Sequence, residues 1–181
     1  MKVRYSREEM RTEWMRRRWL EPIRADCRIS RSDGVDLEAV AESEMRLWFL
    51  DQLAGAPPEL LKVTDLTLTA KAKRTGDRVT VDLPADTVRV ARVRLAGWMR
   101  DAEIVADPHG KTARRQENRF SRGGVEHPVA VVAGSRLELY SAESAVAVPG
   151  VECLWVIKDP GPEIYEFDER LWGRVAPMWN D

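Results

Sequence analysis

The chain has 181 residues, with 29 lysines and arginines against 30 aspartates and glutamates, which gives a net charge of −1. That length predicts one domain, or one domain with a smaller lobe, and 44% hydrophobic residues exclude wholesale disorder. The apolar runs are too short to cross a bilayer, and two cysteines with no preceding signal peptide exclude a secreted disulfide framework. We therefore expect a cytoplasmic protein that has no contact with membranes.

The near-zero net charge hides a segregation along the chain. Residues 1–31 carry a net charge of +5, 32–61 of −6, 62–122 of +6 and 123–181 of −6. Alternating blocks suit contacts between copies of one protein, because a basic surface on one copy can meet an acidic surface on the next. The alternative is that the blocks neutralise one another within a single folded subunit.

Residues 6–20 are predicted to form an amphipathic helix. Ser6 followed by Glu9 fits a capping box, and Pro22 ends the pattern because proline disfavours helical geometry in the residue before it. The apolar face consists of Met10, Trp14, Met15, Trp19 and Leu20, and the rest is largely covered by Arg11, Arg16, Arg17 and Arg18. A stripe this narrow is poorly suited to the centre of a core, so we expect it to pack on a partner or on a neighbouring lobe.

A second helix is predicted from near Asp36 to Leu53. Gly55 is its expected C-terminal stop, and Pro57-Pro58 follow beyond it. The helix is broadly apolar, through Leu37, Val40, Ala41, Met45, Leu47, Trp48 and Leu50.

From Leu66 the hydrophobic period changes from 3.6 to 2, which predicts strands. Residues 66–73 and 78–83 alternate on either side of Thr75-Gly76-Asp77, the pattern of a β-hairpin. A strand over 88–95 changes phase after Val90, which indicates a bulge or burial on both faces. The further predicted elements are one or two helical turns within 112–120, strands at 128–132, 136–140 and 153–158, and a short acidic helix over 166–174 that carries Leu171 and Trp172.

This order of elements predicts an α+β fold, with N-terminal helices followed by a mostly antiparallel β-sheet with short helical segments. Repeated strand–helix–strand units are missing, which argues against a parallel sheet. We expect a helical region over 1–61, a β-rich region over 62–158 and a C-terminal tail with a short helix over 159–181, together forming one folded unit.

Motifs for nucleotide or metal binding are missing. Gly110-Lys111-Thr112 lacks the glycine that a phosphate-binding loop requires five residues earlier, because that position is Val105. His109 and His127 have no cysteine, histidine or carboxylate at metal-ligand spacing.

The remaining nucleophiles and acids form no recognisable catalytic set. Ser135 and Ser141 lack a G-x-S-x-G context, and Cys27 and Cys153 are expected to be small buried residues or bystanders. We therefore predict that the protein is not an enzyme and uses no cofactor or metal. A hydrolase whose site does not show in the sequence stays open as an alternative.

Two basic clusters raise the question of nucleic-acid binding. Arg16-Arg17-Arg18 lie beside Trp14 and Trp19, which places cations next to rings that can stack. The second cluster consists of Lys111, Arg114, Arg115, Arg119 and Arg122. Both clusters can neutralise phosphates, but a pI near 6.2 is far from that of dedicated nucleic-acid binders. A solvated or neighbour-facing basic patch is the alternative.

Several short strings over residues 45–141 carry a resemblance. They are Leu47-Trp48-Phe49-Leu50, Ala56-Pro57, Leu60-Leu61, Leu83-Pro84-Ala85-Asp86 leading into Arg89-Val90, Val93, Leu95 and Trp98, then Gln116, Asn118, Phe120, Gly123, Pro128-Val129-Ala130, Leu137 and Leu139-Tyr140-Ser141. Together they resemble uncharacterised phage and prophage structural proteins of Bacteroidetes, including portal-ring and head–tail connector proteins of crAss-like phages. The resemblance implies an α+β subunit that assembles into a ring around the DNA exit channel without a cofactor.

The sequence and the resemblance together predict a non-enzymatic virion assembly protein. It would form a homo-oligomer or dock to phage portal or capsid proteins, and it would belong to the virion if a phage encodes it. Trp14, Trp19 and Trp172 are the expected interface anchors. The basic residues at 16–18 and 111–122 would face a neighbour or make non-specific contact with DNA. The alternative is a small nucleic-acid-binding protein that uses the basic clusters at 11–18 and 111–122.

Overall fold

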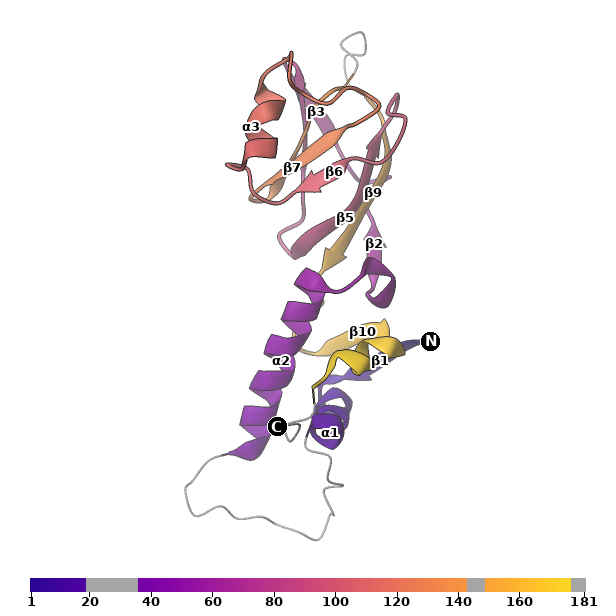
Figure 1. The fold of residues 1–181 in the computed structure, drawn as a ribbon. Coiled ribbons are helices and arrows are strands. Elements are labelled where there is room, and N and C mark those ends of the chain that lie inside the picture. Colours follow the sequence, from indigo (N-terminus) through magenta and orange to yellow (C-terminus); the bar gives the residue numbers. More distant parts are fainter. Residues whose placement is uncertain (19–35, 143–148, 177–181) are drawn as a thin grey trace. The chain divides into compact units, whose positions relative to one another are not determined.

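The structure is a computed structural model, in which residues 1–18, 36–142 and 149–176 are described (Figure 1). Helices and mostly antiparallel strands make up these ranges, which confirms the predicted α+β class. No helix among the described residues is long and apolar enough to cross a membrane.

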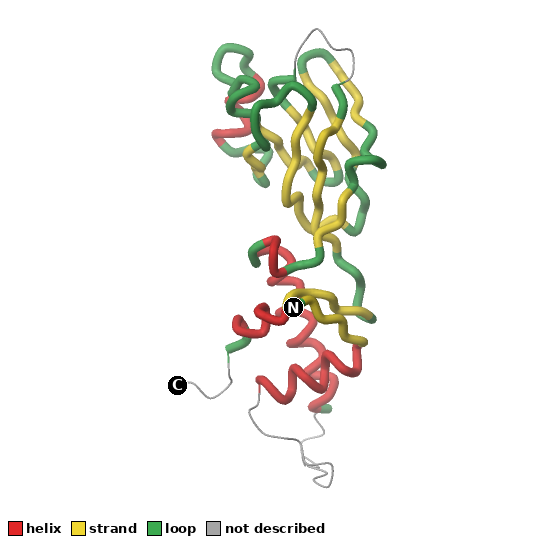
Figure 2. The backbone as a smooth tube through the Cα atoms, turned by 90° about the vertical axis from the view of Figure 1, so that its right-hand side faces the viewer, coloured by secondary structure: helices red, strands yellow, loops and turns green. Residues whose placement is uncertain are grey.

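The chain divides into two compact units, one rich in helices and one rich in strands (Figure 2). The terminal unit consists of Met1–Lys62 together with Asp159–Asp181, and the central unit consists of Val63–Lys158. The sequence predicted a helical region over 1–61, a β-rich region over 62–158 and a C-terminal tail over 159–181, together forming one folded unit. The structure differs because a strand from the tail pairs with a strand at the N-terminus, which joins the two ends of the chain in one unit.

The terminal unit combines helices with one two-stranded sheet. Strand β1 pairs antiparallel with β10, in a register that places Tyr5 opposite Tyr165. Its elements are β1 (Lys2–Ser6), α1 (Arg7–Arg18), α2 (Leu37–Gly55), the 3-10 helix η1 (Pro58–Leu60), β10 (Ile164–Asp168) and the 3-10 helix η2 (Glu169–Arg174).

Polar caps fix where the two long helices begin. The Glu9 carboxylate accepts hydrogen bonds from the Ser6 backbone N–H at 2.8 Å and the Ser6 hydroxyl at 2.9 Å, which confirms the capping box. The same contacts hold the pKa of Glu9 below its usual range. Asp36 caps α2 by accepting from the backbone N–H groups of Glu38 and Ala39. Helix α2 continues through Gly55, two residues further than expected.

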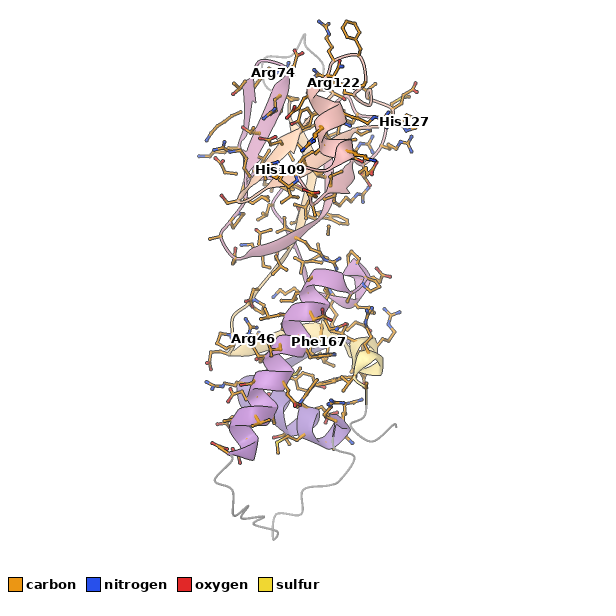
Figure 3. The ribbon with its side chains drawn as sticks, turned by 60° about the vertical axis from the view of Figure 1, so that its left-hand side comes forward. Arg46, Arg74, His109, Arg122, His127 and Phe167 are labelled. Carbon is orange, nitrogen blue, oxygen red and sulfur yellow. The ribbon has the colours of Figure 1, made fainter. Side chains whose placement is uncertain are left out.

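Aromatic side chains form the core of the terminal unit, around Phe167 beside α2 (Figure 3). The ring centroid of Phe167 lies 5.4 Å from that of Trp172, and Trp172 stacks on Trp48 at 5.6 Å. Trp48 in turn lies 5.4 Å from Trp14. Of the predicted stripe, Met10, Trp14 and Met15 are buried inside this unit, so they pack on the chain itself and not on a separate partner. Trp19 and Leu20 lie outside the described residues.

The central unit is built from two sheets. The first has the strand order β2-β9-β5, and the second has the order β3-β4-β8-β7-β6, in which only β6 and β7 run parallel. The elements are β2 (Val63–Asp65), β3 (Ala72–Thr75), β4 (Arg78–Asp82), β5 (Thr87–Leu95), β6 (Glu103–Val105), α3 (Lys111–Glu117), β7 (Val129–Ala133), β8 (Arg136–Leu139) and β9 (Val151–Lys158).

Alternating apolar residues from both sheets form one core in this unit. The inward side chains include Val79, Val81, Val90, Val93, Leu137, Leu139, Leu154 and Val156. On the other side of β7, Val129 and Val131 form a second, smaller cluster with Tyr140 and with Ala113 of α3.

The predicted hairpin and bulge are both present. Strands β3 and β4 pair around Gly76, whose φ of +61° is a conformation that glycine adopts without strain. Strand β5 shifts register between Val90 and Arg92, as its change of phase indicated. The hairpin's first strand begins only at Ala72, because the chain after Asp65 turns instead of continuing straight.

The C-terminal segment is only partly helical. Residues 166–168, expected to start a helix, belong to β10, and the helical part is the 3-10 helix η2. Asp168 ends the strand and caps η2 by accepting from the Arg170 backbone N–H at 3.1 Å. The Arg170 guanidinium, 2.7 Å away, is the first cause of the lowered pKa of Asp168.

Candidate functional site

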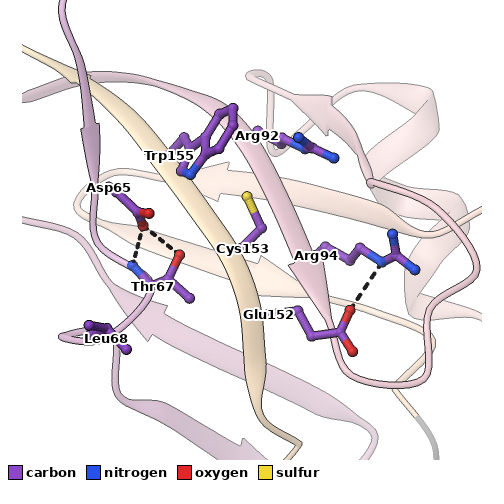
Figure 4. Close-up of a pocket in the computed structure, with 8 residues that line it drawn as sticks. All are labelled: Asp65, Thr67, Leu68, Arg92, Arg94, Glu152, Cys153 and Trp155. Atoms are coloured by element: carbon purple, nitrogen blue, oxygen red, sulfur yellow. Dashed lines mark hydrogen bonds and ion pairs between the residues drawn. The ribbon is translucent and has the colours of Figure 1, made fainter.

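The outer face of the β2-β9-β5 sheet presents a tryptophan at its centre (Figure 4). Because side chains alternate along a strand, buried Leu154 and Val156 leave Trp155 on the outer side of β9. The register of the sheet places Trp155 between Asp65 of β2 and Arg92 of β5. Strand pairing therefore fixes an aromatic ring between an anion and a cation.

Arg92 covers the indole and is itself held in place. Its guanidinium carbon lies 5.0 Å from the centroid of the Trp155 ring, within the range of a cation–π contact. Its Nε lies 2.7 Å from a carboxylate oxygen of Asp101, and this pairing raises the pKa of Arg92. Trp155 keeps 37% of its surface exposed. The pair is thus ordered and still accessible to a partner.

A polar turn shapes the β2 side of this face. The Asp65 carboxylate accepts from the backbone N–H of Thr67 at 2.8 Å and from its hydroxyl at 2.5 Å. These bonds, that of the Thr67 hydroxyl first, lower the pKa of Asp65. The Thr67 hydroxyl also accepts from the backbone N–H of Leu154 at 3.0 Å, which ties the turn to β9. The turn leaves Leu68 fully exposed at the rim.

These residues enclose a shallow depression of about 420 Å³. Arg94 and Glu152, which also line the depression, form an ion pair at 3.2 Å. Burial raises the pKa of the Cys153 thiol, which keeps that group protonated and weakly nucleophilic at neutral pH. We call the whole set the Trp155 surface: Asp65, Thr67, Leu68, Arg92, Arg94, Glu152, Cys153 and Trp155. The Trp155 ring lies in the middle of this surface, Leu68 lies at its rim, and the Arg92–Asp101 and Arg94–Glu152 ion pairs lie beside it.

A second depression, of about 580 Å³, lies over Tyr140. The Tyr140 hydroxyl donates to one oxygen of Glu138 at 3.0 Å, and Arg78 approaches the other oxygen at 3.0 Å. The Arg78 guanidinium also lies over the Tyr140 ring, 5.2 Å from its centroid. Burial first, and the Glu138 hydrogen bond second, raise the pKa of Tyr140 to about 12. Both oxygens of Glu138 already have partners, so this depression holds a closed polar network.

The Tyr140 network predicts a delayed step in an alkaline titration. We expect tyrosinate absorbance to show a delayed step near pH 12, and we expect Tyr140→Phe to remove the contribution of one tyrosine from it. Burial also raises the pKa of Tyr165, so the titration of that residue is delayed as well. Because the folded state holds the Tyr140 proton more tightly than the unfolded state, with its pKa near 10, stability should fall as pH rises from about 10 to about 12. Glu138→Gln should move the step to lower pH. Complete ionisation of all tyrosines below pH 11 in the folded protein would contradict the assignment.

Two of the three predicted tryptophan anchors, Trp14 and Trp172, are not surface residues. Trp14 and Trp172 are each 3% exposed, inside the aromatic core of the terminal unit. The proposal that they anchor a partner is therefore wrong for the folded unit, because their rings are already covered by the chain itself. Trp19 lies outside the described residues.

The basic cluster at 11–18 is compensated within the terminal unit. Arg16 and Arg17 both pair with Glu13, at 2.6 and 2.5 Å. Arg18 donates to the backbone carbonyl of Ala176 at 2.5 Å. The Arg17 guanidinium carbon lies 4.9 Å from the centroid of the Trp172 ring. These contacts satisfy the arginines locally and leave less charge for a phosphate.

The cluster at 111–122 is divided by the structure. Lys111, Arg114, Arg115 and Arg119 are exposed on α3 and the loop after it. Arg122 folds back instead, with its side chain 14% exposed and its guanidinium 3.3 Å from Asp77. Arg122 therefore does not face a neighbour or DNA as expected, because that acidic partner in the β3–β4 turn neutralises it.

The two histidines lie apart in the central unit (Figure 3). His127 contacts Arg100, and the backbone N–H of His109 donates to Asp107 at 2.9 Å in a turn. Among the described residues, no group of three or more histidines, cysteines or acids is placed to hold a metal ion. Cys27 lies outside the described residues.

No protein-family model matches this sequence, and comparison with curated proteins likewise finds no match.

Sequence patterns did not single out Trp155, Arg92 or Arg94 as surface residues. The alternation on strands 88–95 and 153–158 contained the signal, since charged and aromatic residues occupy the positions between the apolar ones. Which of the two faces is buried depends on the packing of two sheets, and no single strand reveals that.

Proposed function

We propose that this chain is a non-enzymatic assembly protein of the phage head–tail connector or portal-ring type. It acts by associating with further copies of itself, and the Trp155 surface is the contact. The observation that carries the proposal is the exposed Trp155 ring, fixed beneath Arg92 on an open sheet face.

The composition of this surface favours a protein partner. Tryptophan and arginine are enriched among the residues that contribute most to protein interfaces. The Arg92–Asp101 and Arg94–Glu152 pairs order the arginine side chains before binding, which reduces the entropy lost on association. Leu68 is fully exposed in a single copy, so its apolar side chain is available for contact with a partner.

Charge favours a second copy as that partner. Residues 63–158 carry 15 basic and 12 acidic side chains, whereas the rest of the chain carries 14 basic and 18 acidic ones. The central unit is thus net positive, at +3, and the terminal unit net negative, at −4. Opposite net charges on two units of one chain favour head-to-tail association, which closes into a ring where the geometry permits.

Light scattering across a concentration series tests this proposal. We expect the wild-type protein to form a discrete oligomer, well above the 20.7 kDa of one chain, that weakens with added salt. Trp155→Ala and Leu68→Glu should each shift the protein toward monomer. Leu68 is fully exposed, so its substitution should leave the fold intact. Leu68→Glu therefore tests the proposal even if Trp155→Ala fails to fold.

Met99→Ala is the matched control, because Met99 is a large exposed side chain of the same unit that lies outside the Trp155 surface. It should leave the oligomer unchanged. The proposal is overturned if the wild-type protein stays monomeric at high concentration, or if Trp155→Ala and Leu68→Glu both keep the wild-type mass.

A further inference from the structure

We propose that the loop after α3 binds single-stranded nucleic acid, with Phe120 stacking on a base while nearby cations contact phosphates. The site consists of Lys111, Arg114, Arg115, Arg119 and Phe120, none of which belongs to the Trp155 surface. The inference goes beyond self-association and does not depend on it.

Phe120 is the most conspicuous exposed aromatic side chain of the described chain, with 97% of its surface open to solvent. Exposing a phenyl ring to water is unfavourable and contributes nothing to the core of this unit. A base or another apolar group stacked on the ring would remove that exposure, and every base offers a face for such stacking.

Hydrogen bonds hold the loop in the shape that presents this ring. The Asn118 side chain accepts from the backbone N–H of Phe120 at 2.9 Å. The Ser121 hydroxyl donates to the backbone carbonyl of Arg115 at 2.9 Å, which ties the loop back to α3. On its far side the loop is fixed by Gly123, whose N–H donates to Gln116 and whose carbonyl accepts from the Ser141 hydroxyl. The ring is therefore presented on an ordered support.

Four of the five cations close to Phe120 in the sequence have no ion-pair partner among the described residues. From Lys111 to Arg122 the chain carries five basic residues and one acidic residue, Glu117. Arg122 is paired with Asp77, but no described residue forms an ion pair with the side chains of the other four. This contrasts with the cluster at 11–18, where local acids neutralise the arginines. Free positive charge beside an exposed ring is complementary to a phosphate chain that carries bases.

A single strand fits this arrangement better than a membrane or a duplex. Phe120 is the only large apolar side chain between Lys111 and Arg122, and one ring is little anchorage for a bilayer. Three of the four cations that have no ion-pair partner in the described part of the chain are arginines, whose planar guanidinium groups match phosphate oxygens. Bases in a duplex are already stacked on one another, whereas those of a single strand are open to the ring.

Fluorescence anisotropy with a labelled oligothymidine of about 20 nucleotides provides the test. We expect Phe120→Ala to weaken binding about tenfold, since stacking on a base is lost. Arg115→Ala should weaken binding and also make it less sensitive to salt. The slope of log K, the association constant, against log salt concentration should become less negative by about 0.7. Both side chains are exposed, so neither substitution should alter folding.

Met99→Ala is again the matched control and should bind like the wild type. Light scattering on Phe120→Ala should show an unchanged oligomer, which separates failure of this inference from failure of the self-association proposal. Wild-type affinity in Phe120→Ala would overturn the inference. So would Phe120-dependent binding to vesicles of anionic lipid by a protein that leaves oligothymidine unbound, because the loop would then be a membrane contact.

Discussion

Replacing Phe167 by alanine is expected to destabilise the terminal unit strongly, lowering its free energy of unfolding by about 3–5 kcal/mol. Phe167 is completely buried, and its ring lies within 6.4 Å of four other aromatic rings, measured between centroids. Those rings belong to Tyr5, Trp48, Phe49 and Trp172, which come from β1, α2 and η2. Truncation therefore opens a cavity where three elements meet.

Thermal unfolding followed by tryptophan fluorescence measures this effect, because Trp14, Trp48 and Trp172 all lie in the affected core. Far-ultraviolet circular dichroism should still report strands, since the core of the central unit contains no residue of the terminal unit. Leu47→Ala is the control: Leu47 sits on α2 but is 68% exposed, so its truncation should change stability by less than about 0.5 kcal/mol. Equal unfolding midpoints for the two variants would contradict the position of Phe167.

Local patterns predicted the elements whose causes are local. The capping box at Ser6 and Glu9 acts within one turn, and the hairpin at Gly76 needs only a turn residue and alternation beside it. The phase change after Val90 likewise announced the bulge in β5. In each case the residues that decide the structure lie within a few positions of one another.

Elements that depend on distant residues escaped the sequence patterns. Strands β1 and β10 are short and lie at opposite ends of the chain, so each becomes a strand only through the other. Trp14 was expected at a surface because its stripe is narrow, but it packs against Trp48 of α2, which itself stacks on Trp172. The helical period in the sequence shows which residues share a face of a helix. Which segments pack against that face depends on the tertiary fold.

The same distinction applies to the candidate sites. The exposed cations at 111–119 were predicted, because charge is visible in the sequence. Exposure of Phe120 was not predicted, since a lone phenylalanine is more often buried. Trp155 required knowledge of the outward face of β9, which is set by the second sheet.

Gly123→Ala is expected to destabilise the central unit by about 3 kcal/mol. A Cβ placed on Gly123 would lie 2.0 Å from the carbonyl oxygen of His127 and 3.1 Å from its carbonyl carbon. Both are backbone atoms, so no side-chain rotation can relieve the overlap. The backbone N–H of His127 is itself bonded to the Gly124 carbonyl at 3.1 Å, which holds this turn closed. The loop that carries Phe120 would have to move.

Gly124→Ala is a control one residue away, because a Cβ at Gly124 would meet nothing within 4 Å. With no strained backbone angle at that position, the substitution should be neutral or slightly stabilising, since it restricts the unfolded chain. Thermal unfolding compares the two variants directly, and oligothymidine binding should weaken only in Gly123→Ala as its loop shifts. The two variants should differ only because residue 123 closely approaches the backbone of His127. Equal unfolding midpoints for both variants would therefore show that this loop does not pack as described.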